Sequence, residues 1–498
     1  MPIDSVHPQY KKWEGRWKRC RDAYEGEEAV KAATVEYLPK LSSHTSRSDP
    51  KYQAYLMRAM FFGATNRTVE GMTGLVQRKP AIIEVPAEME PYLDDITGTG
   101  IDIQEFIKGA LDEVLAVGRY GIQVDVDPPG TDEPRAYFIG RLAEDVSNWR
   151  VSGTELTLVV FREVEMVENP DDPYEAEEKI IYRELFLGSI ADEQTGQPLE
   201  GKVLQSRIWR ENPQKKDEYI PEAPIIAERR TGEVDVIPFT FVGTSSTASS
   251  VSKPPLLDLV NVNMSHYRNS ADLEHGRHFT GLPTPVISGI DPEDGDKILI
   301  GSEQAITIKD PAARASYLEF SGQGLQSLET ALVEKQENMA VLGARILEVS
   351  KKAAETAETT RLNKSGDTST MISIAGAVES AVTIALQQMA VWLGHDPEQV
   401  SVEINRDLLD STMDPQMVTA LLKLFQEGIT SKETLYKQLQ QGELLPDDFD
   451  PDEEQRLIEQ AKPDLEGEPM DLTPQARRLE IVRDQTGRAT GAVETAGA

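Results

Sequence analysis

The chain has 498 residues, of which 39% are hydrophobic and 27% are charged, so it can form several domain-sized units with apolar cores. Its 85 Asp and Glu residues outnumber 51 Lys and Arg residues, and the net charge of −34 argues against a protein that grips DNA by neutralising phosphates along its surface. The single cysteine, Cys20, excludes an intrachain disulfide and every metal site built from several cysteines.

The first part of the chain is predicted to be helical. Residues 51–77 favour one helix that stops before Pro80, and the apolar positions from Ile103 to Leu115 favour another. A helix is also predicted over residues 8–25, where four aromatic residues recur at helical spacing. We expect these four side chains to pack against a neighbouring element: Tyr10, Trp13, Trp17 and Tyr24.

From about residue 135 to residue 243 the pattern changes to strands. Short runs rich in β-branched and aromatic residues are separated by turn sequences, for example Ser152-Gly153. This pattern predicts an antiparallel meander that finishes with a strand over 236–242. A link rich in Ser and Thr, residues 243–250, follows the last strand.

The second half is predicted to contain two helices that flank a small insert. The first helix runs from Leu256 to about His278, and the second runs from Leu325 to about Leu342. The insert between them is predicted to contain a short acidic helix over 292–297 and a strand over 305–308.

The last part of the chain begins with a polar stretch, residues 348–362, which we interpret as a flexible loop. A helix with strict apolar spacing then runs to Leu393, and its small residues permit close helix packing. We further expect a strand over 400–404 and a helical hairpin over 414–442. The acidic, proline-containing tail beyond residue 462 is expected to be disordered.

Motifs for an enzyme are missing from the sequence. It contains no G-x-x-x-x-G-K-[ST] phosphate loop, no G-x-S-x-G nucleophile turn and no H-E-x-x-H metal motif. We therefore predict that the protein is not an enzyme and expect neither a cofactor nor a metal. The N-terminal residues also lack the apolar segment of a secretory signal, and no uninterrupted apolar run of about 18 residues occurs, so we expect no membrane partner.

Two weaker patterns remain as alternatives. Asp125 and Asp127 share one face at the end of a predicted strand, where they could bind Mg²⁺ in a nuclease or form an ordinary solvated strand end. His275 and His278 lie three residues apart beside Glu274, a spacing compatible with a metal site or with surface histidines near a helix end.

The order of these predicted elements resembles the portal (head-to-tail connector) proteins of tailed bacteriophages. The resemblance is most specific over about 252–393. Residues 254–259 and 265–272, followed by 282–285, resemble a portal stem helix that runs into the clip. Residues 342–347, with 355–357, resemble the passage from the second stem helix to the tunnel loop.

The resemblance implies an α+β, ring-forming portal fold that is mainly helical. It divides the chain into eight regions: an N-terminal wing over 1–250 with helices and a β-rich meander, a first stem helix over 251–281, a clip over 282–322, a second stem helix over 323–346, a tunnel loop over 347–363, a long wing helix and return strand over 364–410, a helical crown over 411–461, and an acidic disordered tail over 462–498.

The resemblance also implies a function in a virion. A ring, typically of twelve subunits, would form a channel at one capsid vertex through which double-stranded DNA is packaged and ejected. Its partners would be the terminase, head-completion (adaptor) proteins, and capsid and scaffold proteins, and it would assemble in the host cytoplasm. Other readings are a cytoplasmic homo-oligomeric scaffold or adaptor without DNA passage, or the nuclease already described.

Three groups of candidate residues follow from the resemblance. Channel residues of the tunnel loop would keep DNA centred: Lys351, Lys352, Arg361 and Lys364. Clip residues would dock the terminase and adaptor proteins: Pro285, Ile287, Asp291, Glu293, Lys297 and Lys309. Stem residues would line or brace the channel: Leu256, Leu259, His266, Leu325, Leu328 and Leu332. An acidic wall suits a DNA conduit because many phosphate contacts would slow the release of the duplex.

Overall fold

The structure is a computed structural model that divides into two units, residues 1–408 and 409–498, each described here by itself. For residues 357–369 only the backbone is described. The described residues are 2–127, 135–169, 172–189, 202–226, 228–229, 232–280, 284–288, 314–318, 323–343, 357–406, 408, 415–427, 429–441, 444–445, 449–451, 453–454, 456–457, 478–483 and 489–495.

The first unit opens with four helices: α1 (Pro8–Glu25), α2 (Glu27–Ala32), α3 (Pro50–Arg58) and α4 (Ala64–Val76), with a 3-10 turn at Thr34–Glu36. The packing role predicted for the aromatic stripe of α1 is confirmed. Trp17 is fully buried and meets the Tyr10 ring edge-on at 5.5 Å, while Trp13 and Tyr24 pack against the same core.

The prediction of one helix over 51–77 is wrong, because α3 and α4 are separate. Residue Ala59 leaves the helical conformation with ψ at 136°, and the chain then crosses α7 (Leu257–Thr280). There the N–H of Met60 donates to Ser270 Oγ at 3.2 Å, and Phe61 lies edge-on to Tyr267 at 6.1 Å. Contacts with a distant helix therefore favour the break over the continuous helix that local pattern indicates.

A three-stranded sheet and two helices form the main core. The sheet has the order β12 (Phe239–Gly243), β2 (Arg119–Val126), β3 (Ala136–Leu142), with both pairings antiparallel. Helices α6 (Ile103–Val117) and α9 (Ala357–Leu393) pack against it. Smaller elements at the edge are β1 (Ile82–Glu84), which pairs with β15 (Ser401–Glu403), a 3-10 turn at Ala87–Met89, α5 (Glu90–Leu93) and a 3-10 turn at Pro397–Gln399.

Gly118 links this core to the start of α7. It ends α6 in the left-handed region with φ at +84°, where a side chain would be strained. A Cβ atom there would also lie 2.8 Å from the Cα atom of Pro254, just before α7. Glycine at this position thus allows the α6–β2 turn and the α7 entry to touch.

The second sheet is a meander of β4 (Val146–Ser152), β5 (Glu155–Asn169), β6 (Asp172–Gly188), β7 (Val203–Asn212) and β8 (Lys215–Pro221), with β9 (Ile225–Ile226) also paired to β7. A separate short hairpin joins β10 (Glu228–Arg229) and β11 (Gly232–Glu233). The meander is confirmed, and the strand predicted at its end exists as β12, but the assignment of that strand to the meander is wrong. Residues Phe239–Gly243 pair with β2, so this strand belongs to the first sheet.

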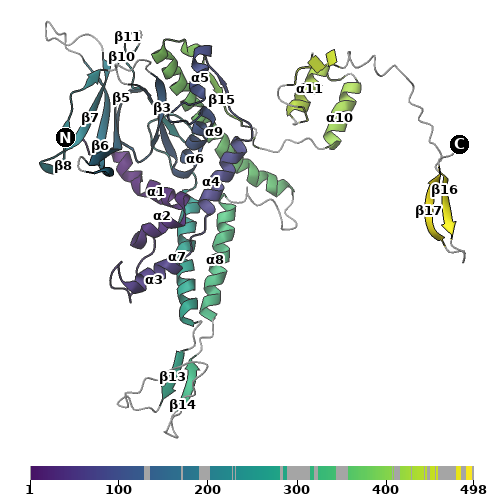
Figure 1. Cartoon of the computed structure of the whole chain (residues 1–498), viewed down its shortest axis with the longest axis horizontal. Coiled ribbons are helices and arrows are strands. Elements are labelled where there is room, and N and C mark those ends of the chain that lie inside the picture. The colour runs from purple at the N-terminus through teal and green to yellow at the C-terminus, as the bar shows by residue number, and fades with distance from the viewer. Residues whose placement is uncertain are drawn as a thin grey trace. The chain divides into compact units, whose positions relative to one another are not determined.

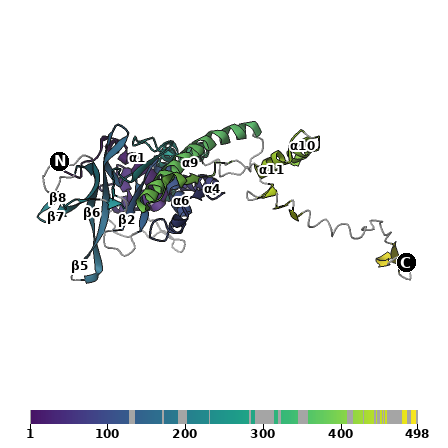
Figure 2. The ribbon, with the colours of Figure 1, turned by 90° about the horizontal axis from the view of Figure 1, so that it is seen from above.

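The paired strands β5 and β6 extend past their neighbours as a two-stranded ribbon, visible from above in Figure 2. Their pairing continues to Asn169 and Asp172, whereas β4 pairs β5 only as far as Phe161 and β7 pairs β6 only from Tyr182. Both outer edges of the ribbon are therefore unpaired within the described sheet.

Helix α7 is followed by a hairpin of β13 (Thr284–Ser288) and β14 (Arg314–Leu318), then by α8 (Gln323–Val341). Figure 1 shows α7 and α8 side by side in teal and green. The short helix predicted over 292–297 and the strand predicted over 305–308 lie outside the described residues.

Helix α9 begins at Ala357, so the polar loop predicted over 348–362 is wrong for its last residues. By length and composition its segment Thr370–Leu393 could cross a membrane, and half of that window is buried (50%). Its apolar face, however, forms part of the main core through fully buried residues such as Ile374, Val378 and Leu386. In this fold the segment serves as a core helix.

The second unit contains the predicted helical hairpin, formed by α10 (Pro415–Gln426) and α11 (Lys432–Gln441). The expectation of a disordered tail is wrong for part of its length. Strands β16 (Arg478–Arg483) and β17 (Ala489–Thr495) pair antiparallel there. Leu479 and Ile481 alternate with charged residues, which is a strand pattern, although the segment as a whole is polar.

Charged clamps join the helices and sheets of the first unit. Arg21 of α1 binds Glu113 of α6 through two hydrogen bonds of 3.0 and 2.8 Å, and binds Glu144 in the β3–β4 turn at 2.8 and 2.9 Å. The two carboxylates hold the pKa of Arg21 above its ordinary value despite burial, because they stabilise the charged guanidinium. Removing the Arg21 side chain would leave the partly buried carboxylates of Glu113 and Glu144 without their shared cation.

We expect Arg21→Met to lower the free energy of unfolding by about 2 kcal/mol, less than for a fully buried pair because the three side chains keep some solvent contact. Chemical denaturation checks this loss. The control Lys11→Ala lies on the exposed side of the same helix and should change stability by no more than about 0.5 kcal/mol. Equal stability of the two variants would contradict the role given to the clamp.

Candidate functional site

The candidate site is built around the antiparallel pair of α7 and α8. The stem residues predicted from the sequence lie on these two helices, except Leu256, which comes directly before α7 and packs in the main core. Leu259 lies in a buried cluster with Met339 of α8 and Ala64 of α4. Of the six, the first three are buried and the last three are half-buried: Leu256, Leu259, His266, Leu325, Leu328 and Leu332.

Polar contacts fix the two helices against each other. Arg277 of α7 donates to Glu274 at 2.8 Å and to Glu329 of α8 at 2.7 Å. Near the other end, the side chains of His266 and Gln336 lie 3.3 Å apart. These contacts bridge the pair at separate heights, so the helices are held along their length.

The opposite side of α7 is buried against the N-terminal helices. Its apolar residues Leu257, Val260, Met264, Tyr267 and Ala271 share a core cluster with residues of α1 and α3. The hydroxyl of Tyr55 in α3 also donates to Asp272 at 2.6 Å. Helix α7 is therefore covered on two sides, which explains why it has little amphipathic pattern.

The side chain of His266 is buried in this packing. Its ring meets Phe62 at 5.7 Å, and no hydrogen-bond partner of its Nδ1 atom is found among the described residues. Burial lowers the pKa of His266 from 6.5, and the nearby Lys335 lowers it further. A proton added here would place a positive charge beside the Phe62 ring and close to the cation of Lys335.

The clip and channel residues are described only in part. Pro285 and Ile287 lie in β13, paired with Tyr317 and Ala315 of β14. Arg361 and Lys364 lie in the first turns of α9, where the backbone alone is described. Six predicted residues fall outside the described part of the chain: Asp291, Glu293, Lys297, Lys309, Lys351 and Lys352.

Both carboxylates of the nuclease alternative accept hydrogen bonds from nearby backbone N–H groups. Asp127 accepts the backbone N–H of Arg135 at 3.0 Å. Asp125 accepts the N–H of Val126 at 2.9 Å, and burial raises its pKa while Arg183 and Arg141 oppose that shift. Within the described residues, no group of three or more His, Cys, Asp or Glu side chains is placed to hold a metal ion.

Those two arginines belong to a network that joins the sheets. Arg141 of β3 donates to Gln123 of β2 at 2.9 Å and to Glu163 of β5 at 2.6 Å, and Arg183 of β6 donates to Glu163 at 3.0 Å. The charges around Asp125 therefore serve a structural contact between two sheets.

The histidines of the second weak pattern also have structural surroundings. His275 meets the ring of Tyr55 edge-on at 5.2 Å, and burial lowers its pKa, as does nearby Arg58. His278 lies on the exposed side near the end of α7. His275 thus belongs to the contact between α3 and α7.

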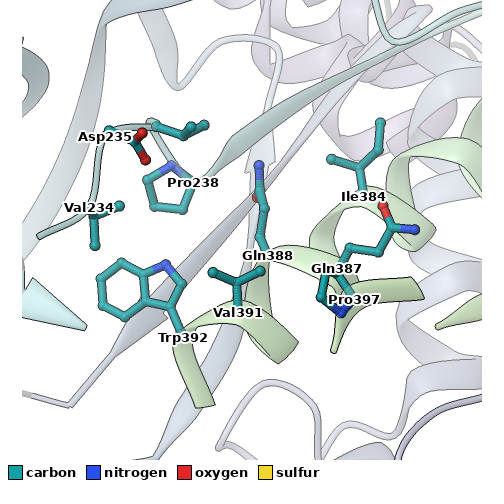
Figure 3. Close-up of a pocket in the computed structure, with 10 residues that line it drawn as sticks. Val234, Asp235, Pro238, Ile384, Gln387, Gln388, Val391, Trp392 and Pro397 are labelled. Carbon is teal, nitrogen blue, oxygen red and sulfur yellow. The ribbon is translucent and has the colours of Figure 1, made fainter. Parts of the chain in front are cut away.

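A pocket of about 200 Å³ lies between α9 and the segment before β12 (Figure 3). Helix α9 contributes Val391 and Trp392, and the facing segment contributes Val234 and Pro238. Asp235 is the single titratable side chain of the lining. The pocket accordingly offers an apolar surface without the paired acid and base that general acid–base catalysis uses.

Sequence reasoning assigned no role to the outer faces of α3 and α8. On α3 the outer face includes Lys51, Met57 and Arg58, and on α8 it includes Glu334 and Glu337. One signal was available in the sequence, because residues 40–79 contain seven basic and two acidic residues in a strongly acidic chain. Which of these side chains stay exposed depends on the packing of α7.

Comparisons with known proteins give distant similarities. The family described as a domain of unknown function (DUF4055) matches residues 255–393. No curated protein matches the chain. One similar solved chain is from the neck of a native GTA particle computed with C12 symmetry, with 13% identity and a TM-score of 0.38 over 82% of this chain and 97% of that chain.

Two further solved chains are similar to the same degree. One comes from the neck of an empty GTA particle computed with C6 symmetry, at 12% identity and a TM-score of 0.39, covering 80% of this chain and 95% of that chain. The other comes from the virion of a native gene transfer agent (GTA) particle, at 11% identity and a TM-score of 0.37, covering 86% and 98%. Similarities this distant do not establish a shared fold or function.

The buried position of His266 predicts a pH-dependent stability. Because its folded-state pKa lies below 6.5, its contribution is complete above about pH 6.5 and is lost as the pH falls toward the folded-state value. We expect the melting temperature to fall more between about pH 7.5 and about pH 5.5 in the natural protein than in His266→Gln. The matched control is His278→Gln, at an exposed position of the same helix. A pH dependence lost equally in both variants would refute this assignment.

Proposed function

We propose that the chain is the subunit of a ring-shaped portal of a phage-like particle, through which double-stranded DNA enters and leaves the capsid. The observation that carries the proposal is the α7–α8 pair. One long helix, α7, is buried on two sides, and its antiparallel partner α8 leaves an outer face with Val333 and Val341 more than half exposed. Exposed apolar side chains on a rigid pair of helices are suited to contact with another subunit.

The electrostatics of the chain support the same proposal. With a net charge of −34, a channel made from many copies would repel the DNA phosphates instead of holding them. A few cations near a constriction would keep the duplex centred, and Lys351, Lys352, Arg361 and Lys364 are the residues we assign to that role.

The remaining roles follow from this assignment. The segment between α7 and α8, with its hairpin β13–β14, would dock the terminase during packaging and head-completion proteins afterwards. The protein itself would be no enzyme, because the motor chemistry would belong to the terminase. We assign it to the portal vertex of the virion, after assembly in the host cytoplasm with capsid and scaffold proteins.

Electron microscopy of the purified protein tests the proposal directly. We expect closed rings, of about twelve copies, with an axial hole wide enough for a DNA duplex. Class averages with a closed centre would favour the scaffold alternative, and a monomer at micromolar concentration would overturn the proposal. Asp125→Asn should behave like the natural protein in a Mg²⁺-dependent cleavage assay, and cleavage that this substitution abolishes would favour the nuclease.

The channel residues are tested by reversing their charge. We expect Lys351→Glu with Lys352→Glu to assemble normally but to package or retain less DNA, because added negative charge repels the phosphates at the constriction. The control Lys215→Glu with Lys216→Glu makes the same charge change in β8. Packaging equal to that of the control would contradict the role of these lysines.

A further inference from the structure

Helices α3 and α8 lie on opposite sides of α7, as Figure 1 shows. On one side, Val260, Met264 and Tyr267 of α7 pack in the cluster that contains Tyr52 and Tyr55 of α3. On the other side, Leu259 packs with Met339 of α8. The faces of α3 and α8 that point away from α7 are therefore two different surfaces of one subunit.

The outer face of α8 combines apolar and acidic groups. Val333 and Val341 are 53% and 59% exposed, and Glu337 lies between them at helical spacing with Glu334 beside it. Neither glutamate forms a salt bridge with a described residue. The α8 outer face, as we call Val333, Glu334, Glu337 and Val341, thus has apolar surface and unpaired negative charge together.

The outer face of α3 has the opposite charge. Met57 is 73% exposed, and the exposed Lys51 and the half-buried Arg58 lie two turns apart on the flank of the helix next to it. Neither cation forms a salt bridge with a described residue, although Arg58 influences the pKa of His275. We call Lys51, Met57 and Arg58 the α3 outer face.

We infer that the α3 outer face of one subunit docks on the α8 outer face of the next copy of this chain. Met57 would meet the two valines, while Lys51 and Arg58 would face Glu334 and Glu337. Because the two surfaces differ and lie on opposite sides of α7, the contact is head-to-tail and can repeat around an axis. This inference rests on the proposed function and names the surfaces that would join the ring.

A charge exchange tests the contact. Lys51→Glu with Arg58→Glu, and separately Glu334→Lys with Glu337→Lys, should each weaken self-association at least about tenfold, because like charges would then face each other. A chain with all four substitutions should assemble again, and so should an equimolar mixture of the two double variants. Sedimentation velocity measures assembly, and circular dichroism checks that each variant is folded.

Glu88→Lys is the control, because it changes an exposed charge in a 3-10 turn away from both faces. It should assemble like the natural protein. If the natural protein forms rings and the double variants assemble equally well, the inference is overturned while the proposed function stands. If the natural protein stays monomeric, both are overturned.

Two other outcomes would also reject the contact. Assembly that is lost in the double variants but not restored by their combination would mean that the two faces do not meet each other. Normal assembly with reduced retention of a DNA duplex in Lys51→Glu with Arg58→Glu would instead assign the α3 outer face to nucleic acid.

Discussion

Helix α7 is buried on two sides, and this burial fixes how the neighbouring helices of the first unit are arranged. One side packs against α1 and α3 through Val260, Met264 and Tyr267, and the other side packs against α8. A helix covered in this way cannot move independently of the N-terminal helices, so α8 is held by the same body. The break between α3 and α4 has the same origin, since Met60 and Phe61 leave the helix to contact Ser270 and Tyr267.

Charged side chains join helices and sheets of the first unit to one another, in addition to the apolar core. Arg21 holds α1 to α6 and to the turn before β4, and Arg141 with Glu163 and Arg183 holds the two sheets together. Each network pairs its charges with hydrogen bonds, which offsets the cost of partial burial.

Strand β12 also connects segments that are far apart in the chain. Its residues pair with β2, so the long excursion through the meander returns to the main core.

The ring that we propose has a physical reason: a rigid pair of helices whose outer surface exposes apolar and charged side chains. The acidic composition suits contact with a cationic neighbour, and so do Glu334 and Glu337, which form no salt bridge with any described residue. Head-to-tail contacts join two unlike faces, so a single subunit needs no internal symmetry. The symmetry arises when the repeated contact closes a ring around the axis. The same arrangement leaves the hairpin β13–β14 between the two helices in the chain, where we place the docking of other proteins.

From local apolar periodicity, the sequence predicted the helices α1, α6, α7, α8 and α9, the meander and the α10–α11 hairpin, and with them the mixed α+β class. It did not predict the α3–α4 break, the sheet to which β12 belongs, the start of α9 or the hairpin β16–β17. The partners of Arg21, which lie 92 and 123 positions away, could not be read from local pattern either. These features, and the exposure of Met57 and Val333, depend on packing between segments far apart in the chain, which local pattern does not contain.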